Sequence, residues 1–261
     1  MNENKTNINC DTGILWKIYS NYWKYWIFDV EIFTYLIKWG EIMDSIDKRN
    51  SVKKDYNLIA DQYFAEYGIE LEDIELINKF KSFLDKDSTI VDLGGGAGKL
   101  SNYFIQKGFN STCYDFSENM RNYAQRNFPD VPFILDDILN VNNHFSSNSL
   151  EAITSMYSLF HIPKEDINQL FLDINNILKE NGLFCFSLQL GNGEEFVDEP
   201  YLKEKGKNVL YMNYFTKNEI YDLLNESNFD IIYEIEKHET GDNVIGEDGN
   251  DAIYIIARKR S

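Results

Sequence analysis

The sequence predicts an α/β fold, a doubly wound sheet of about seven strands whose last pair is antiparallel. Two observations carry this prediction. From residue 89 onward, short apolar segments alternate with helical patterns, which is typical of a parallel sheet covered by helices on both faces. The first of these segments runs into a glycine-rich loop at residues 94–98, and folds of this class bind ligands where a strand meets such a loop.

The individual elements follow from local patterns. Ser117 is placed to cap one helix, and Thr216 with Glu219 three residues later forms a capping box at another. The continuous apolar run 183–190 indicates a central strand. Strands are expected at 89–93, 110–115, 132–136, 150–156 and 183–190, followed by an antiparallel pair at 230–237 and 252–258. Helices are expected at 69–83, 99–107, 118–128 and 164–179, and after Thr216.

We divide the chain into three parts. Residues 1–50 are expected to form an aromatic-rich helical cap or lid, since all four tryptophans lie there and apolar positions recur at helical spacing, with a break near Phe28–Val30. Charged residues interrupt this segment too often for a membrane span. It either packs on the core or on a second subunit in a homodimer, or it forms an aromatic wall over the site. Residues 51–88 are a helical lead-in, and residues 89–261 are the core.

Composition limits the classes of partner. The 261 residues are 43% hydrophobic, which is enough for one large core. The net charge of −18 opposes nucleic-acid binding and disfavours an anionic membrane surface. The cysteines Cys10, Cys113 and Cys185 are far apart, so no disulfide framework and no metal site is expected. With no apolar signal segment at the start, we expect a cytoplasmic protein.

The glycine loop predicts a nucleotide cradle. Gly94, Gly96 and Gly98 alternate, as expected where a strand turns sharply and a ligand approaches the backbone. The following helix points free N–H groups at that ligand. A dinucleotide fingerprint fails because Lys99 stands where its third glycine belongs, and a phosphate-binding loop fails because Leu100 follows Lys99. A nicotinamide-dependent oxidoreductase is therefore the less favoured alternative.

Two further positions carry chemistry. Asp115 closes the second strand, 23 residues after Asp92, and a carboxylate there can accept both hydroxyls of a ribose. His161 follows the fourth strand. It is either a general base of near-neutral pKa or a hydrogen-bonded structural histidine.

These positions resemble the motifs of the class I S-adenosylmethionine-dependent methyltransferases, small-molecule type, over roughly residues 52–260. The first motif is Asp92-x-Gly94-x-Gly96-x-Gly98. The other matching segments are Tyr56-x-x-Ile59-Ala60-x-x-Tyr63, Asp115-Phe116-Ser117-x-x-Met120, Asp136-Asp137-Ile138 and Phe160-His161-Ile162-Pro163. One departure is Gly95, where the family often has cysteine or alanine, and we expect it to change loop flexibility rather than ligand class.

The resemblance implies a Rossmann-like fold and S-adenosyl-L-methionine as cofactor. It implies that Phe116 lies against the adenine, that Asp137 accepts from the adenine amine, and that Asp92 lies near the aminoacyl end. Tyr56 and Tyr63 would lie on a mobile helix over the cofactor. The remaining candidates for cofactor binding are Gly94, Gly95, Gly96, Asp115, Met120, Ile138 and Met156, and those for catalysis are His161 and Tyr157.

The acceptor is expected to be a small molecule methylated at N or O. Segment 192–251 holds sixteen Asp or Glu against five lysines. It is either a solvated face or an acidic, aromatic-lined mouth that favours an amine or cationic acceptor. The non-enzymatic alternative is a cofactor-binding scaffold that assembles through the N-terminal helices.

Overall fold

The computed structural model describes residues 44–67, 71, 73–198, 202, 209–239 and 250–261. The chain divides into two units, residues 1–43 and residues 44–261. Residues 1–43 of the predicted aromatic cap, with its break near Phe28–Val30 and the homodimer through it, therefore lie outside the described residues. The predicted boundary between residues 50 and 51 falls inside one continuous helix, α3 (Ser45–Tyr67).

A seven-stranded sheet forms the centre of the second unit, in the order β3-β2-β1-β4-β5-β9-β8. The first five strands are parallel, and β9 lies antiparallel between β5 and β8. This confirms the predicted sheet and its antiparallel closing pair. The strands are β1 (Thr89–Leu93), β2 (Asn110–Asp115), β3 (Phe133–Leu135), β4 (Leu150–Ser155), β5 (Leu178–Gln189), β8 (Phe229–Glu239) and β9 (Asn250–Lys259).

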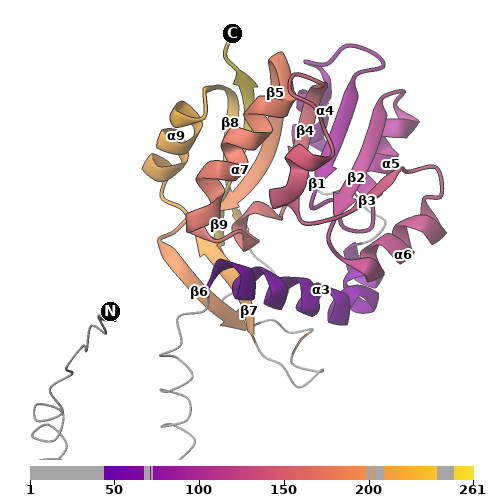
Figure 1. Cartoon of the computed structure of the whole chain (residues 1–261), viewed down its shortest axis with the longest axis vertical. Helices are drawn as coiled ribbons and strands as arrows, with labels where there is room; N and C mark the ends of the chain where they lie inside the picture. Colours follow the sequence, from indigo (N-terminus) through magenta and orange to yellow (C-terminus); the bar gives the residue numbers. More distant parts are fainter. Residues whose placement is uncertain (1–43, 68–70, 72, 199–201, 203–208, 240–249) are drawn as a thin grey trace, which may run out of the picture. The chain divides into compact units, whose positions relative to one another are not determined.

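Helices cover both faces of this sheet (Figure 1). Along β5, Phe184 and Phe186 pack in the hydrophobic cluster of α7 (Lys164–Ile177) and α9 (Lys217–Glu226). The alternate residues Leu183 and Cys185 pack with α4 (Ile74–Lys81) and α5 (Lys99–Gln106). Both faces of the strand are thus buried, which explains the continuous apolar run in its sequence.

The predicted helix starts are present. Ser117 accepts a hydrogen bond from the backbone of Met120 at 3.1 Å and caps α6 (Glu118–Asn127). The capping box of Thr216 and Glu219 opens α9. The helix expected at 69–83 is shorter, since α4 begins at Ile74. Two short 3-10 helices, η2 (Ile138–Asn143) and η3 (Leu159–His161), follow β3 and β4.

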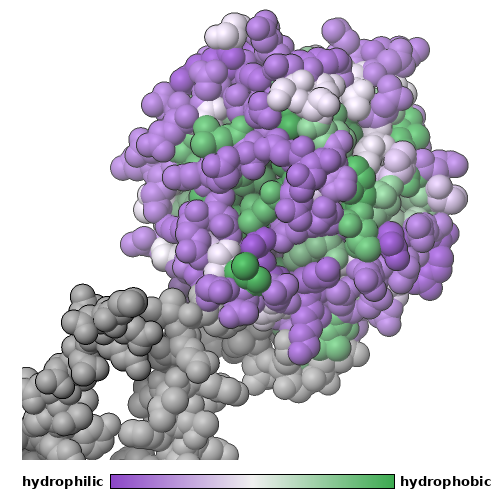
Figure 2. All heavy atoms as spheres, in the orientation of Figure 1, coloured by the Kyte–Doolittle hydropathy of each residue, from purple (hydrophilic) through white to green (hydrophobic). Residues whose placement is uncertain are grey.

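Helix α3 lies across the carboxyl ends of the parallel strands (Figure 1). Beside its N-terminal half is a two-stranded sheet of β6 (Gly193–Asp198) and β7 (Val209–Tyr214), which sequence reasoning did not predict. The face seen in Figure 2 is dominated by hydrophilic residues, with hydrophobic ones showing between them. None of the described helices combines the length and apolar character needed to cross a bilayer.

Candidate active site

The glycine loop between β1 and α5 adopts a backbone conformation that residues with a side chain would not easily adopt. Gly94 has φ +68, and a Cβ there would lie 2.4 Å from Cβ of Ser158. Gly96 has φ +54, but a Cβ there would meet nothing within 4 Å. The backbone of Gly96 therefore faces open space, as a cradle for a ligand requires.

Gly95 departs from the family pattern for a steric reason. A Cβ at this position would lie 2.6 Å from Oδ2 of Asp92 and 2.9 Å from Sγ of Cys113. The space that alanine or cysteine would need at position 95 is already filled by the Cys113 thiol and the Asp92 carboxylate. The structure thus shows close packing under the loop, and the expected change in loop flexibility stays a prediction.

A cavity of about 700 Å³, partly open to solvent, lies between this loop and α3. A second cavity of about 680 Å³ adjoins it and shares Tyr63, Gly94 and Tyr157 with it. Asp92 and Gly95 line the second cavity. The other predicted site residues line the main one: Tyr56, Tyr63, Gly94, Gly96, Asp115, Phe116, Met120, Asp137, Ile138, Met156, Tyr157 and His161. The structure thus brings all the predicted residues together, and their individual roles stay predictions.

Asp115 ends β2 beneath the glycine loop. Its Oδ2 accepts from the Gly96 amide at 3.0 Å, and its Oδ1 accepts from the Ser117 amide at 2.8 Å. Burial raises the pKa of this carboxyl to about 6, against the opposing effect of these two hydrogen bonds. Asp115 is therefore oriented by the backbone and ionised at neutral pH, with lone pairs left for a ligand.

Asp92 is buried deeper. Its Oδ1 accepts from the Thr154 hydroxyl at 2.7 Å, and the residue is 2% exposed. Burial raises its pKa to about 7. A positively charged group entering the second cavity would favour the ionised form of Asp92.

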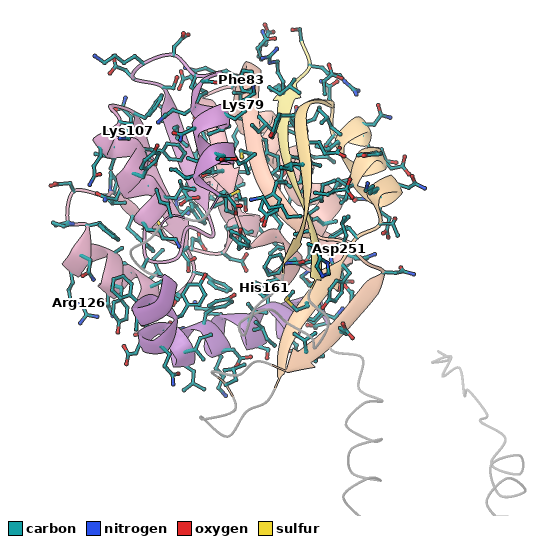
Figure 3. The ribbon with its side chains drawn as sticks, turned by 180° about the vertical axis from the view of Figure 1, so that it is seen from behind. Lys79, Phe83, Lys107, Arg126, His161 and Asp251 are labelled. Carbon is teal, nitrogen blue, oxygen red and sulfur yellow. The ribbon has the colours of Figure 1, made fainter. Side chains whose placement is uncertain are left out.

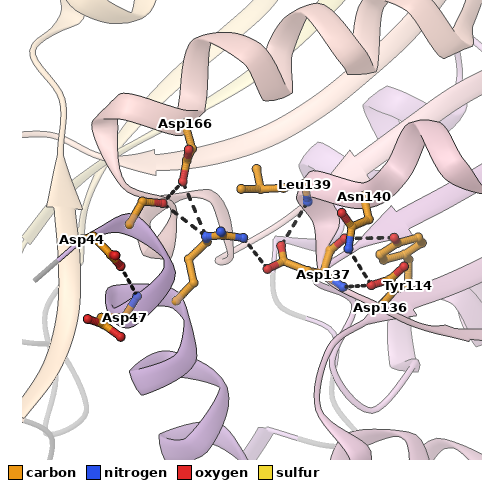
Figure 4. Close-up of polar contacts among 10 residues, drawn as sticks. Asp44, Asp47, Tyr114, Asp136, Asp137, Leu139, Asn140 and Asp166 are labelled. Atoms are coloured by element: carbon orange, nitrogen blue, oxygen red, sulfur yellow. Dashed lines mark hydrogen bonds and ion pairs between the residues drawn. The ribbon is translucent and has the colours of Figure 1, made fainter. Parts of the chain in front are cut away.

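The acidic pair after β3 divides into two roles. Asp136 accepts from Nε2 of His144 and from the side-chain amide of Asn140, both at 2.8 Å, so it organises the turn. Asp137 lines the cavity. Its Oδ1 accepts from the Leu139 amide at 3.1 Å, and its Oδ2 lies 2.5 Å from Nη1 of Arg49 (Figure 4).

His161 is held as a neutral imidazole. Its Nδ1 lies 2.8 Å from the carbonyl oxygen of Tyr211, which can only accept, so Nδ1 carries the proton. Its Nε2 then accepts from the Tyr56 hydroxyl at 2.8 Å. Burial lowers the pKa of His161 to about 4, which keeps the ring neutral. Figure 3 shows His161 between the strand ends and α3. Its hydrogen bond to Tyr56 therefore links the core to α3, which forms the roof of the cavity.

Tyr157 is held through both its hydroxyl and its backbone amide. Its hydroxyl donates to Asp73 and lies 3.0 Å from the Tyr254 hydroxyl. Burial and these neighbours hold the pKa of Tyr157 far above its ordinary value. The residue also has a positive φ of 56°, with its amide donating to the Ser187 hydroxyl at 2.8 Å. The Tyr157 hydroxyl is therefore engaged by Asp73 and Tyr254 while the residue lines the main cavity, and its catalytic role stays a prediction.

Sequence reasoning missed several lining residues, namely Arg49, Val52, Ser158 and Ile162. For two of them a signal existed. Arg49 and Val52 precede Tyr56 by seven and four residues, and this spacing places them on the same face of a helix. The resemblance began at residue 52, so the preceding turn of α3 was assigned to the cap.

The sequence matches the methyltransferase domain family over residues 62–234. This is more than half of the chain, and the chain belongs to that family. The demethylmenaquinone methyltransferase of Chlamydia felis is 32% identical over 107 residues, covering 40% of this chain and 45% of that protein. The phosphoethanolamine N-methyltransferase of Plasmodium falciparum is 26% identical over 181 residues, covering 66% and 64%. The chain spans about half the length of the first curated relatives that it matches.

Solved structures share the fold. A methyltransferase from Methanosarcina mazei, described as S-adenosylmethionine-dependent, superposes with a TM-score of 0.62 at 20% identity, covering 74% of this chain and 99% of that one. The 1,6-didemethyltoxoflavin-N1-methyltransferase of Burkholderia thailandensis superposes with a TM-score of 0.61 at 16% identity, covering 84% and 92%. That structure contains bound 1,6-didemethyltoxoflavin and S-adenosylhomocysteine.

Proposed function

We propose that this methyltransferase uses S-adenosyl-L-methionine to methylate N or O of a small molecule. The observation that carries the proposal is one cavity lined by the open backbone of Gly96, the oriented carboxylate of Asp115 and the Tyr56–His161 pair. Membership of the methyltransferase domain family supports it. The fold is also shared by a methyltransferase described as S-adenosylmethionine-dependent and by one with bound S-adenosylhomocysteine, which supports the choice of cofactor.

The lining of the two adjoining cavities fits this cofactor in chemistry. Asp115 would accept from the ribose hydroxyls, and Asp137 would accept from the adenine amine. Asp92, in the second cavity, would face the ammonium of the aminoacyl end. Bound there, the cofactor supplies a methyl group already activated by its sulfonium.

The protein itself aligns the acceptor and removes a proton. Cavity side chains that hold the nucleophile in line with the methyl group can lower the activation barrier by several kcal/mol. The neutral His161 is placed to take a proton through Tyr56, because the Tyr56 hydroxyl already donates to Nε2. As a nucleophile gives its proton to the Tyr56 oxygen, Tyr56 passes its own proton to His161.

The lining favours an acceptor with an aromatic or apolar body. Among the described residues, the charged groups lining the main cavity are Arg49, Asp115 and Asp137, and the proposal uses the two acids for the cofactor. Glu194, from the acid-rich segment, accepts from the Tyr211 hydroxyl at 2.6 Å and pairs with Lys48 at 2.9 Å. An amine or cationic acceptor would therefore rest on the rings of Tyr56 and its neighbours.

Two measurements test the proposal. Isothermal titration of S-adenosylhomocysteine should show binding to the wild type, a loss of at least about tenfold in Asp115→Ala, and no change in Asp130→Ala, an exposed acid outside the cavities. A metabolite screen with a labelled methyl donor should then identify an acceptor. Failure of the wild type to bind the cofactor would overturn the proposal, and binding without turnover on any acceptor would favour a scaffold.

A further inference from the structure

The roof of the cavity carries a cation that the proposed reaction does not use. Among the described residues lining the main cavity, Arg49 alone is positively charged, and it comes from the second turn of α3. Asp137, on the opposite wall, is the N-cap residue of η2. The 2.5 Å contact between Nη1 of Arg49 and Oδ2 of Asp137 therefore joins the roof to the core at the cavity itself.

Arg49 also has a second acidic partner. Its Nε lies 3.5 Å from Oδ2 of Asp166, in the first turn of α7. Ser45, one turn earlier in α3, accepts from the same Nε at 3.4 Å and donates to Asp166. The guanidinium thus contacts both Asp137 and Asp166, which are labelled in Figure 4, so one side chain joins α3 to two core elements.

We propose that Arg49 is a cofactor-retaining residue, whose ion pairs with Asp137 and Asp166 hold α3 closed over the adenosine end of the cavity. The inference rests on the proposed function, in which Asp137 and the cavity wall around it bind the adenine. Arg49 and Asp137 each line the cavity, so their contact has to open when a nucleoside passes between them.

The charges explain why this contact holds. The side chains of Arg49, Asp137 and Asp166 are 18%, 26% and 26% exposed, so solvent screens them less than a fully exposed pair. Without the guanidinium, two carboxylates of like charge would face each other across the same gap. That repulsion would favour an open α3.

The other end of α3 is anchored separately. Asn57 accepts from the Ser117 hydroxyl at 2.8 Å, and Asp61 accepts from the Tyr123 hydroxyl, so this half stays on α6. The N-terminal end can therefore open without releasing the helix as a whole. Lys48, beside Arg49, pairs with Glu194 at 2.9 Å. Since Lys48 ties α3 to β6 and contacts neither Asp137 nor Asp166, it offers a matched control for the contact at the adenosine end.

The test is the rate at which S-adenosylhomocysteine leaves the full-length protein, measured by surface plasmon resonance. Arg49→Met should raise the dissociation rate about tenfold and change the association rate by less than about threefold. In the wild type, dissociation should speed up with added salt, because salt screens the ion pairs. In Arg49→Met that dependence should be weaker, and Lys48→Met should stay close to the wild type.

Asp166→Asn provides an independent arm, because Asp166 lies outside the cavity lining and the substitution leaves Arg49 and Asp137 in place. It should raise the dissociation rate by roughly threefold, and it decides the matter if Arg49→Met fails to fold. Wild-type dissociation rates in both variants, or an equal increase in Lys48→Met, would overturn the inference while leaving the proposed function intact. Absence of binding to the wild type would instead count against the proposed function.

Discussion

At the scale of single residues, the buried carboxylate of Asp115 sets a pH limit on cofactor binding. Its pKa is raised to about 6 by burial. Ribose hydroxyls donate to the ionised form, so the cofactor competes with a proton for this group. We expect the Kd for S-adenosylhomocysteine to rise slightly as the pH falls from about 8 to 7, where Asp92 begins to take up a proton, and more steeply below about 6, where protonation of Asp115 adds up to about tenfold per pH unit. Calorimetry across this range measures it.

The control for this prediction is Asp115→Asn. This variant should bind S-adenosylhomocysteine more weakly and lose the part of the pH dependence of the Kd that Asp115 contributes. A wild-type Kd that is constant down to about pH 5 would show that Asp115 does not accept from the ligand.

The hydrogen bond between Tyr56 and His161 predicts that the two residues act as one unit. Tyr56→Phe and His161→Gln should each lower kcat about 100-fold, and the double variant should be little worse than either, since each substitution breaks the same proton route. Because the pKa of His161 is near 4, its ionisation should not appear in the pH profile around neutrality. The measurement is kcat with the acceptor found by the metabolite screen.

Tyr157→Phe is the matched control, because the Tyr157 hydroxyl is occupied by Asp73 and Tyr254. It should keep kcat within about threefold of the wild type. Independent, multiplicative losses in the Tyr56 and His161 variants would contradict the shared route.

At the scale of elements, the glycine loop offers a packing test. Gly95→Ala places a methyl group against the Cys113 thiol and the Asp92 carboxylate, and we expect it to cost about 1–3 kcal/mol of unfolding free energy. The double variant with Cys113→Ala should lose less than the sum of the two single variants, since shortening Cys113 frees part of the space. Urea unfolding measures all three. Strict additivity would show that Cys113 does not set the identity of residue 95.

The elements that the sequence predicted best are those with strong local signals. The limits of β1 and β2 agree with the prediction because a glycine follows the first strand and an acid closes the second. The hairpin of β6 and β7 was missed because its acids suggested a solvated surface. In the structure Tyr211 and Met212 of β7 are buried, and the first lies near Lys48 of α3 and bonds to Glu194.

The site was predictable to the extent that its residues lie at strand ends or on one helix face. Asp92 and Asp115 lie at the carboxyl ends of β1 and β2, and Asp137 follows β3. Parallel strands bring these ends together. What the sequence could not supply are contacts between distant segments. Arg49 is 88 residues from Asp137, and no local pattern indicates that they meet. The tie between Tyr157 and Asp73 is equally non-local, since 84 residues separate the two in the sequence.

At the scale of the whole molecule, the net charge of −18 predicts how salt acts on stability. Carboxylates in large excess repel one another in the folded state, whereas most described ion pairs are partly or fully solvated and contribute little each. Added salt should therefore weaken the repulsion by more than it weakens the attraction within ion pairs. Raising NaCl from about 20 mM to about 300 mM should increase Tm, by about 2–4 °C if the gain is ~1 kcal/mol.

The same salt should loosen the Arg49 contact and speed cofactor release, so global stability and cofactor retention should move in opposite directions. Calorimetric melting curves and dissociation rates from the same salt series measure both quantities. Near pH 5, where many carboxylates take up protons, the rise in Tm should shrink because less repulsion remains to be screened. A Tm that falls with salt at neutral pH would mean that the ion pairs, and not the excess of negative charge, dominate the electrostatics of this fold.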